Sequence, residues 1–206
     1  MRSHPIGAVC KRLLDVAGAL LCLAVLWPLM AVVAVTIRMT MGRPILFCQM
    51  RPGLNGRPFT LFKFRTMVEG PPSEADPFTD AARLTHIGRA LRRLSLDELP
   101  QLWNVLKGEM SLVGPRPLLM EYLNYYTAEQ AKRHHMKPGI TGLAQVKGRN
   151  AITWKEKFEW DVSYVNHWNF WLDLHILMST VVNVFRREGI SQQGHATVEK
   201  FGAERR

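Results

Sequence analysis

The sequence predicts a mixed α+β, mainly helical fold that is held on one side of a membrane, a monotopic arrangement. Three observations predict it. A long uncharged apolar run near the N-terminus contains a proline, two β-rich runs flank a Pro-Gly turn, and the C-terminal part combines helical periodicity with many aromatic residues. We therefore expect a broken re-entrant N-terminal helix, a small β-hairpin and interfacial amphipathic helices.

The apolar run extends from Val16 to Ile37 without a charge, long enough to cross a hydrocarbon core of about 30 Å. Pro28, preceded by Trp27, lies near its middle, where a proline kinks or breaks a helix. Basic residues flank both ends, and basic flanks favour the cytoplasmic side. They are Arg2, Lys11 and Arg12 before the run, and Arg38 and Arg43 after it. The residues leave a single span and a re-entrant helix both open, and they favour the re-entrant form.

We accordingly divide the chain into a re-entrant membrane helix with basic flanks (1–43) and a membrane-associated domain (44–206). In the second part, 45–50 and 59–67 are expected strands joined by a turn at 52–56. Lys63 and Arg65 lie on one face of the second strand, with Phe62 and Phe64 on the other. The polar, proline-containing stretch 69–80 is expected to be a mobile loop, either a connector or a lid.

The composition favours an anionic partner. Lys and Arg number 27 against 17 Asp and Glu, giving a net charge of +10, which suits lipid head groups, nucleic acid or nucleotide phosphates. The three cysteines, Cys10, Cys22 and Cys48, have no metal-ligand spacing. They are expected to be free thiols in a reducing compartment.

The strongest candidate for chemistry is the adjacent pair Asp97 and Glu98, which follows Arg92 and Arg93. A carboxylate beside cations is expected to stay ionised, so Asp97 could act as a nucleophile and Glu98 could hold a divalent cation. An ordinary structural interpretation competes: Ser95 could cap a helix in a capping box with Glu98, or Asp97 could itself be the cap.

Pro100 bears on that choice, because it fits a helix capped by Asp97 better than one capped by Ser95. Either helix would bury a stripe made of Leu99, Leu102, Trp103 and Leu106. Caps are so common that this stretch alone favours capping over catalysis.

Three further basic stretches are candidates for phosphate binding. Pro115 and Pro117 enclose Arg116, whose planar fork matches a pair of phosphate oxygens. The stretches 137–142 and 147–150 combine glycines with basic residues, and glycines let backbone N–H groups approach an anion. No standard nucleotide-binding fingerprint is present.

The C-terminal part is expected to lie at the membrane interface because indole and phenol groups are amphipathic. Its aromatic residues are Trp154, Trp160, Tyr164, Trp168, Phe170 and Trp171. The apolar segment 172–185 is too short and too polar for a second span. The histidines, including His134 and His135, show no ligand spacing and are interpreted as surface or packing residues.

Taken together, these motifs resemble the bacterial sugar transferase family of small monotopic phosphoglycosyl transferases, and within it the bacillosamine-type initiating enzymes of bacterial N-linked protein glycosylation. The resemblance extends from about Lys11 to Phe201. It rests on the motifs KR-x-x-D at 11–15, the mid-run proline, KFRTM at 63–67, SLDELPQL at 95–102, VGPRP at 113–117 and KPGITG at 137–142. Where the family has a Ser-Pro pair at the helix break, this chain has Trp27-Pro28.

The resemblance implies a reaction. Asp97 would attack the sugar-linked phosphate of a UDP-sugar and release UMP, and undecaprenyl phosphate would then take the sugar phosphate from Asp97. Glu98, with Asp97, would hold Mg²⁺ or Mn²⁺. Arg92, Arg116 and Arg149, and with less support Lys63 and Arg65, would bind phosphate or uridine.

The resemblance also implies a location, the cytoplasmic face of the bacterial inner membrane, with 44–206 as a cytosolic, membrane-associated catalytic domain. Lys11, Arg12, Trp27 and Pro28 would belong to the membrane anchor, and membrane phospholipid, but not nucleic acid, would be a partner. Two other functions stay open: direct glycosyl transfer that releases UDP, and a membrane-tethered basic binding module. The sugar stays open as well; diacetylbacillosamine is favoured over N-acetylhexosamines, galactose and glucose.

Overall fold

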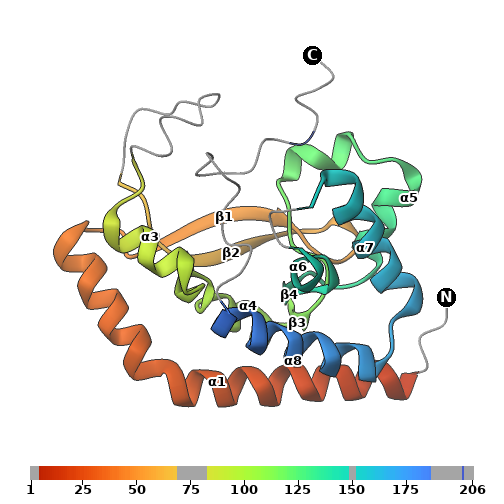
Figure 1. Cartoon of the computed structure of the whole chain (residues 1–206), viewed down its shortest axis with the longest axis horizontal. Coiled ribbons are helices and arrows are strands. Elements are labelled where there is room, and N and C mark those ends of the chain that lie inside the picture. The colour runs from red at the N-terminus through yellow and green to blue at the C-terminus, as the bar shows by residue number, and fades with distance from the viewer. Residues whose placement is uncertain (1–4, 69–82, 149–151, 187–200, 202–206) are drawn as a thin grey trace.

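The computed structural model describes residues 5–68, 83–148, 152–186 and 201 (Figure 1). One long helix, α1 (Pro5–Thr40), forms the base, and the other elements are stacked above it. The fold is mainly helical with two small sheets, as the sequence predicts. The predicted loop at 69–80 lies outside the described residues.

Helix α1 is bent rather than interrupted. Helical structure continues from Pro5 to Thr40 with Pro28 inside it, and Figure 1 shows a long first limb followed by a shorter limb that turns upward. The missing amide of proline and the crowding of its ring explain how one helix accommodates such a bend. Among the described residues, α1 is the one helix long and apolar enough to cross a membrane. Its outward face carries exposed apolar side chains, among them Leu20, Leu21, Val25, Trp27, Val32 and Val35.

The predicted hairpin is confirmed. Strands β1 (Leu46–Pro52) and β2 (Pro58–Phe64) pair antiparallel, with Leu46 opposite Phe64 and Pro52 opposite Pro58. The turn η1 (Leu54–Gly56) contains Asn55 and Gly56 with φ of 54° and 74°. Asparagine and glycine accept this left-handed backbone most readily, which is why this sequence forms the turn.

A second, two-stranded parallel sheet pairs β3 (Ser111–Val113) with β4 (Gly139–Thr141). The backbones meet so closely that a Cβ on Gly139 would lie 2.1 Å from the amide nitrogen of Gly114. Gly139 N–H donates to Pro115 O, and Gly114 N–H donates to Thr141 O. Gly139, within the stretch 137–142, therefore serves the close packing of the two strands.

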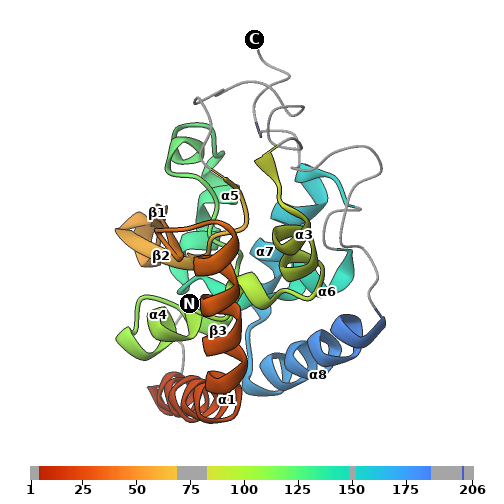
Figure 2. The same ribbon diagram turned by 90° about the vertical axis from the view of Figure 1, so that its left-hand side faces the viewer.

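Helices fill the remaining space around these sheets. They are α3 (His86–Arg93), η2 (Leu96–Glu98), α4 (Gln101–Lys107), η3 (Met120–Asn124), α5 (Ala128–Ala131), η4 (Lys132–His135), α6 (Leu143–Lys147), α7 (Trp154–His167) and α8 (Phe170–Arg186). Helix α8 begins next to the first limb of α1 and then diverges from it, as Figure 2 shows.

Two apolar clusters anchor the two limbs of α1 separately. Ala19 of the first limb belongs to the main core, with Leu61 of β2 and Val105 of α4. Val33 and Ile37 of the second limb pack with Phe64 and Leu91 in another cluster. Because each limb buries its inner face against a different part of the domain, tertiary packing holds the bend that Pro28 permits.

Lys11 and Arg12 are not free basic flanks, which corrects the sequence-based interpretation. The Lys11 ammonium is buried and lies 2.6 Å from Asp173 Oδ2, 2.9 Å from Val113 O and 3.2 Å from Tyr164 Oη. The Arg12 guanidinium donates to the carbonyls of Val105 and Leu106 at the end of α4. Both cations therefore fasten α1 to the domain above it.

The expected aromatic membrane surface is also corrected in part. Tyr164 is buried, and Trp168 donates its indole N–H to Asp173. Trp154 belongs to an aromatic cluster completed by Tyr122, Tyr126, Phe158 and Phe201. Trp171 on α8 is strongly exposed and keeps the predicted character.

Candidate active site

The Asp97–Glu98 pair lies on a short 3-10 turn between two helices, and neither predicted cap forms. Ser95 has a left-handed backbone (φ 55°, ψ 21°) and makes no side-chain capping bond. Helix α4 begins at Gln101, with Pro100 as the preceding residue, so Asp97 is not its cap. Left-handed non-glycine residues are uncommon and gather at functional sites. The turn therefore presents the two carboxylates, and neither of them caps a helix.

The following α4 keeps only part of the predicted apolar stripe. Leu102 is buried, and Leu99 and Leu106 pack against the core. Trp103 is exposed, because it lies on the side of α4 that the core does not cover. The stripe therefore packs α4, which follows the Asp97–Glu98 pair, against the core and leaves Trp103 exposed on the other side.

Glu98 is clamped by two cations from distant parts of the chain. Its Oε1 lies 2.7 Å from Lys63 Nζ and 2.6 Å from Arg116 Nη2, and its Oε2 accepts from Arg116 Nη1 at 3.3 Å. Burial opposes the charged carboxylate, but Arg116 and Lys63 outweigh it and hold the pKa of Glu98 well below its usual range. Glu98 is therefore an ionised group that orients two cations.

Asp97 differs from Glu98 in its hydrogen bonds and in the direction of its pKa shift. Its side chain is buried, and it accepts no hydrogen bond within the described part of the chain. Burial, and then the charge of Glu98, raise the pKa of Asp97 against the opposing charges of Lys63, Arg92 and Arg116. The cations expected beside Asp97 are present and lower its pKa, but burial and Glu98 outweigh them.

The predicted arginines separate into different environments. Arg92 lies near enough to Asp97 to lower its pKa, and its Nε donates to Thr66 Oγ1 at 3.0 Å. The Arg116 side chain is 44% exposed and can meet a ligand. Arg65 instead donates to the carbonyls of Met41 and Arg43, just beyond the end of α1, where it has a structural role. Arg149 lies outside the described residues.

Arg51 and Lys157, two cations that the sequence analysis did not identify, lie near Arg116. Burial, and then the charge of Arg116, lower the pKa of Arg51 to about 10. Burial and Arg116 also lower the pKa of Lys157. Arg51 immediately precedes the hairpin turn, which was a usable signal, whereas nothing in the sequence distinguishes Lys157 from other helical lysines. Mutually repelling cations close to Arg116 create a positive region suited to a polyanion.

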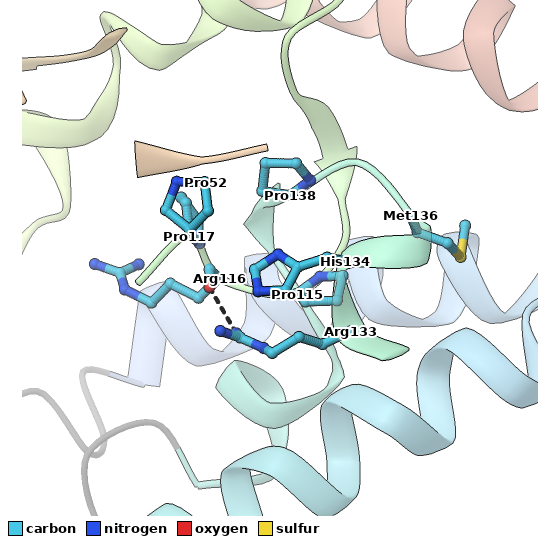
Figure 3. Close-up of a pocket in the computed structure, with 8 residues that line it drawn as sticks. All are labelled: Pro52, Pro115, Arg116, Pro117, Arg133, His134, Met136 and Pro138. Carbon is cyan, nitrogen blue, oxygen red and sulfur yellow. Dashed lines mark hydrogen bonds between the residues drawn. The ribbon is translucent and has the colours of Figure 1, made fainter. Parts of the chain in front are cut away.

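Arg116 is held from behind by Arg133. Figure 3 shows the carbonyl of Arg116 facing Arg133, while the guanidinium of Arg116 points away from Arg133. Arg133 Nη2 donates to that carbonyl at 2.7 Å. Arg133 is itself buried and bound to Asp161 Oδ2 at 2.6 Å and Tyr126 Oη at 3.1 Å. The turn that carries Arg116 is therefore fixed by a buried ion pair.

His134 lies beside the same turn and lines a small cavity with Pro52, Pro115, Pro117 and Pro138 (Figure 3). Burial, and then the charge of Arg133, lower the pKa of His134 to about 4, so it is neutral at pH 7. This agrees with the interpretation of His134 as a packing residue.

The residues can hold a divalent cation only together with a ligand. Within the described ranges there is no group of three or more His, Cys, Asp or Glu side chains placed to hold a metal ion. Both oxygens of Glu98 are already paired with cations. Mg²⁺ at phosphoryl-transfer sites is commonly bound by one or two carboxylates plus substrate phosphates, a mode that Asp97 and Glu98 fit.

The site thus combines Asp97, which accepts no hydrogen bond among the described residues, with Glu98, which is paired with Lys63 and Arg116. Further cations surround the two carboxylates. Such an arrangement favours attack by a carboxylate on a phosphorus atom, because the cations bind phosphate oxygens and offset charge that develops there.

Comparison with known proteins places this site in a family. Residues 6–187 match the bacterial sugar transferase family. The chain is 53% identical over 193 residues to the uncharacterized sugar transferase EpsL of Bacillus subtilis (strain 168), covering 94% of this chain and 96% of that one.

It is 44% identical to a UDP-glucose:undecaprenyl-phosphate glucose-1-phosphate transferase of Caulobacter vibrioides, covering 83% of this chain and 68% of that one. A UDP-galactose-lipid carrier transferase of Erwinia amylovora is 38% identical, with 87% of this chain matching 41% of that protein. The chain therefore belongs to the bacterial sugar transferase family and is an enzyme, a phosphoglycosyl transferase, whose helix α1 is long and apolar enough to cross a membrane.

Proposed function

We propose that the enzyme transfers a sugar-1-phosphate from a UDP-sugar to undecaprenyl phosphate through a covalent intermediate on Asp97. One observation carries the proposal. Of two adjacent carboxylates, Glu98 is bound by Lys63 and Arg116, whereas Asp97 keeps its oxygens free of hydrogen bonds in the described structure. An attacking group needs an accessible lone pair, and the oxygens of Asp97 are less engaged than those of Glu98, which accept from Lys63 and Arg116.

The reaction has two displacements at one phosphorus atom. In the first, an Asp97 carboxylate oxygen bonds to the sugar-bearing phosphorus, and the bond from that phosphorus to the bridging oxygen breaks, releasing UMP. In the second, a phosphate oxygen of the acceptor bonds to the same phosphorus and Asp97 leaves as the carboxylate. Arg116 and Arg92 would bind the phosphate oxygens, and Glu98 would keep Arg116 and Lys63 oriented.

Mg²⁺, replaceable by Mn²⁺, would enter with the diphosphate and neutralise charge on its oxygens. Asp97 would help hold it, together with Glu98 Oε2, which accepts one hydrogen bond and keeps a second lone pair. Chelation with EDTA should stop UMP release from the wild-type enzyme, and added Mg²⁺ should restore it. Unchanged UMP release in EDTA would remove the cation from the proposal.

We propose a UDP-hexose as the donor, because the relatives described above are named for UDP-glucose and UDP-galactose. Diacetylbacillosamine, which the sequence motifs suggested, and N-acetylhexosamines are the competing donors. A panel of these UDP-sugars, with released UMP and UDP both measured, decides the sugar. UDP release in place of UMP would establish direct glycosyl transfer instead.

The mechanism is tested by trapping the intermediate. Wild-type enzyme incubated with the UDP-sugar, without lipid acceptor, should gain the mass of one sugar phosphate, located on Asp97 by mass spectrometry of peptides. Asp97→Asn should remain folded, since Asp97 caps no helix, and should form no adduct. Glu98→Gln is the matched variant at the neighbouring position and should form the adduct slowly.

The contrary outcomes are distinct. An equal adduct in Asp97→Asn, or turnover without any adduct in the wild type, contradicts the covalent mechanism. The absence of turnover with every UDP-sugar, together with tight binding of an anionic polymer, would support the basic binding module.

We propose further that α1 is re-entrant, with both ends on the cytoplasmic face of the inner membrane. The bend at Pro28 and the attachment of both limbs to one domain support this. In a background without the three natural cysteines, Ser3→Cys and Arg43→Cys should both react with an impermeant thiol reagent from the cytoplasmic side alone. Periplasmic labelling at position 3 would establish a spanning helix.

A further inference from the structure

An apolar cavity of about 420 Å³ lies on the concave side of the α1 bend. It is lined by Leu23 and Met30 of α1, Leu46 of β1, Phe62 and Phe64 of β2, and Pro100 and Trp103 at the start of α4. Leu23 and Met30 precede and follow Pro28, so the bend itself forms one wall. This lining contains no charged side chain.

The cavity adjoins the candidate active site through the chain itself. Pro100 is three residues after Asp97 in helical backbone, which corresponds to roughly 5 Å along the chain. Leu96 and Leu99, which enclose the Asp97–Glu98 pair in the chain, pack against the apolar cluster that contains Phe64 of the lining. An apolar chain in the cavity would therefore carry a charged end group close to the dyad and its cations.

The cavity is also reachable from hydrocarbon. Leu46 and Trp103 of its lining are partly exposed, and Trp27 and Leu29, next to Pro28 on α1, are exposed apolar side chains. A molecule already dissolved in the bilayer could enter without its apolar part crossing water, which would cost about 0.8 kcal/mol per CH₂.

We infer that this cavity, which we name the bend cavity, binds the first part of the polyprenyl tail of the acceptor lipid. The inference rests on the proposed function, because the acceptor's phosphate must reach the phosphorus on Asp97. Apolar walls match the hydrocarbon tail, while Lys63, Arg92 and Arg116 match the phosphate at its end. The bend of α1 thus forms part of the acceptor site.

Trp103→Gln tests the bend cavity, with Trp171→Gln as its matched control. Both tryptophans are exposed, on α4 and α8, and glutamine is a good helix former, so both variants should fold. Enzymes are compared in nanodiscs of phosphatidylethanolamine and phosphatidylglycerol. Trp103→Gln should raise the KM for undecaprenyl phosphate roughly tenfold, as a loss of about 1.4 kcal/mol gives, and Trp171→Gln should leave it unchanged.

Two further measurements locate the effect. Adduct formation without acceptor should be normal in Trp103→Gln, since the tail is not involved in the first displacement. Trp103→Leu, which stays apolar, should keep a KM near that of the wild type. A normal adduct with equal KM values in Trp103→Gln and Trp171→Gln would overturn the bend cavity alone, whereas no adduct in the wild type would overturn the proposed function.

A phospholipid acyl chain is the other possible occupant. In that case the KM for undecaprenyl phosphate should stay unchanged in Trp103→Gln while binding of a spin-labelled phospholipid falls, and the inference would be wrong.

Discussion

Loss of the buried Lys11 ammonium should weaken the attachment of α1 to the domain. Lys11 Nζ lies 2.6 Å from Asp173 Oδ2, and the side chain of Asp173 has no exposed surface. In Lys11→Met, Asp173 keeps the Tyr164 hydroxyl at 2.7 Å and the Trp168 indole N–H at 3.0 Å, but no cation. Breaking a buried ion pair on one side costs about 3–5 kcal/mol, and the two remaining donors favour the lower end.

A loss of about 3 kcal/mol corresponds to a fall in Tm of roughly 6–12 °C for a protein of this size. Thermal unfolding in nanodiscs, followed by tryptophan fluorescence, measures it. Lys155→Met is the matched control, because Lys155 is exposed and lies 3.9 Å from Glu159, a surface pair of little value. The double variant Lys11→Met/Asp173→Leu should recover much of the loss, because it leaves no unpaired charge.

The reasoning is refuted if Lys11→Met lowers the Tm no more than Lys155→Met does. It is refuted equally if the double variant is less stable than Lys11→Met, because the unpaired carboxylate would then not be the source of the loss.

Three further predictions concern the site. Arg116→Lys should lower kcat/KM for the UDP-sugar about tenfold, since one charge-assisted hydrogen bond is worth roughly 1.5 kcal/mol; a wild-type value would make Arg116 structural only. Asp161→Asn should raise the KM for the UDP-sugar several-fold by loosening Arg133 behind Arg116; the same rise in Lys11→Met would reveal a general effect of instability. Adduct formation should rise with pH through the raised pKa of Asp97, because the ionised form attacks. Glu98→Gln should move this rise to lower pH, as it removes a negative charge; a move to higher pH would contradict the assignment.

Local sequence determined the elements that depend on neighbouring residues. The uncharged run with Pro28 predicted a long helix broken at that proline, where the structure has a bend in a continuous helix. The turn at 52–56 predicted the hairpin, because turn conformation follows from side chains close together in the chain. The motif around Asp97 and Glu98 pointed to the site even though its capping interpretation was wrong. Ser95 could not have been recognised as left-handed, because residues other than glycine seldom adopt that backbone.

Tertiary structure alone decided how the charges are paired. Glu98 meets Lys63 and Arg116, and Lys11 meets Asp173, across distances in sequence over which no local pattern acts. Basic residues that look alike in sequence therefore received different roles: Lys11 inside, Arg116 at the site. The pKa difference between Asp97 and Glu98 arises in the same way, because burial and the choice of ion-pair partner exist only once α4, β2 and the Arg116 turn have docked.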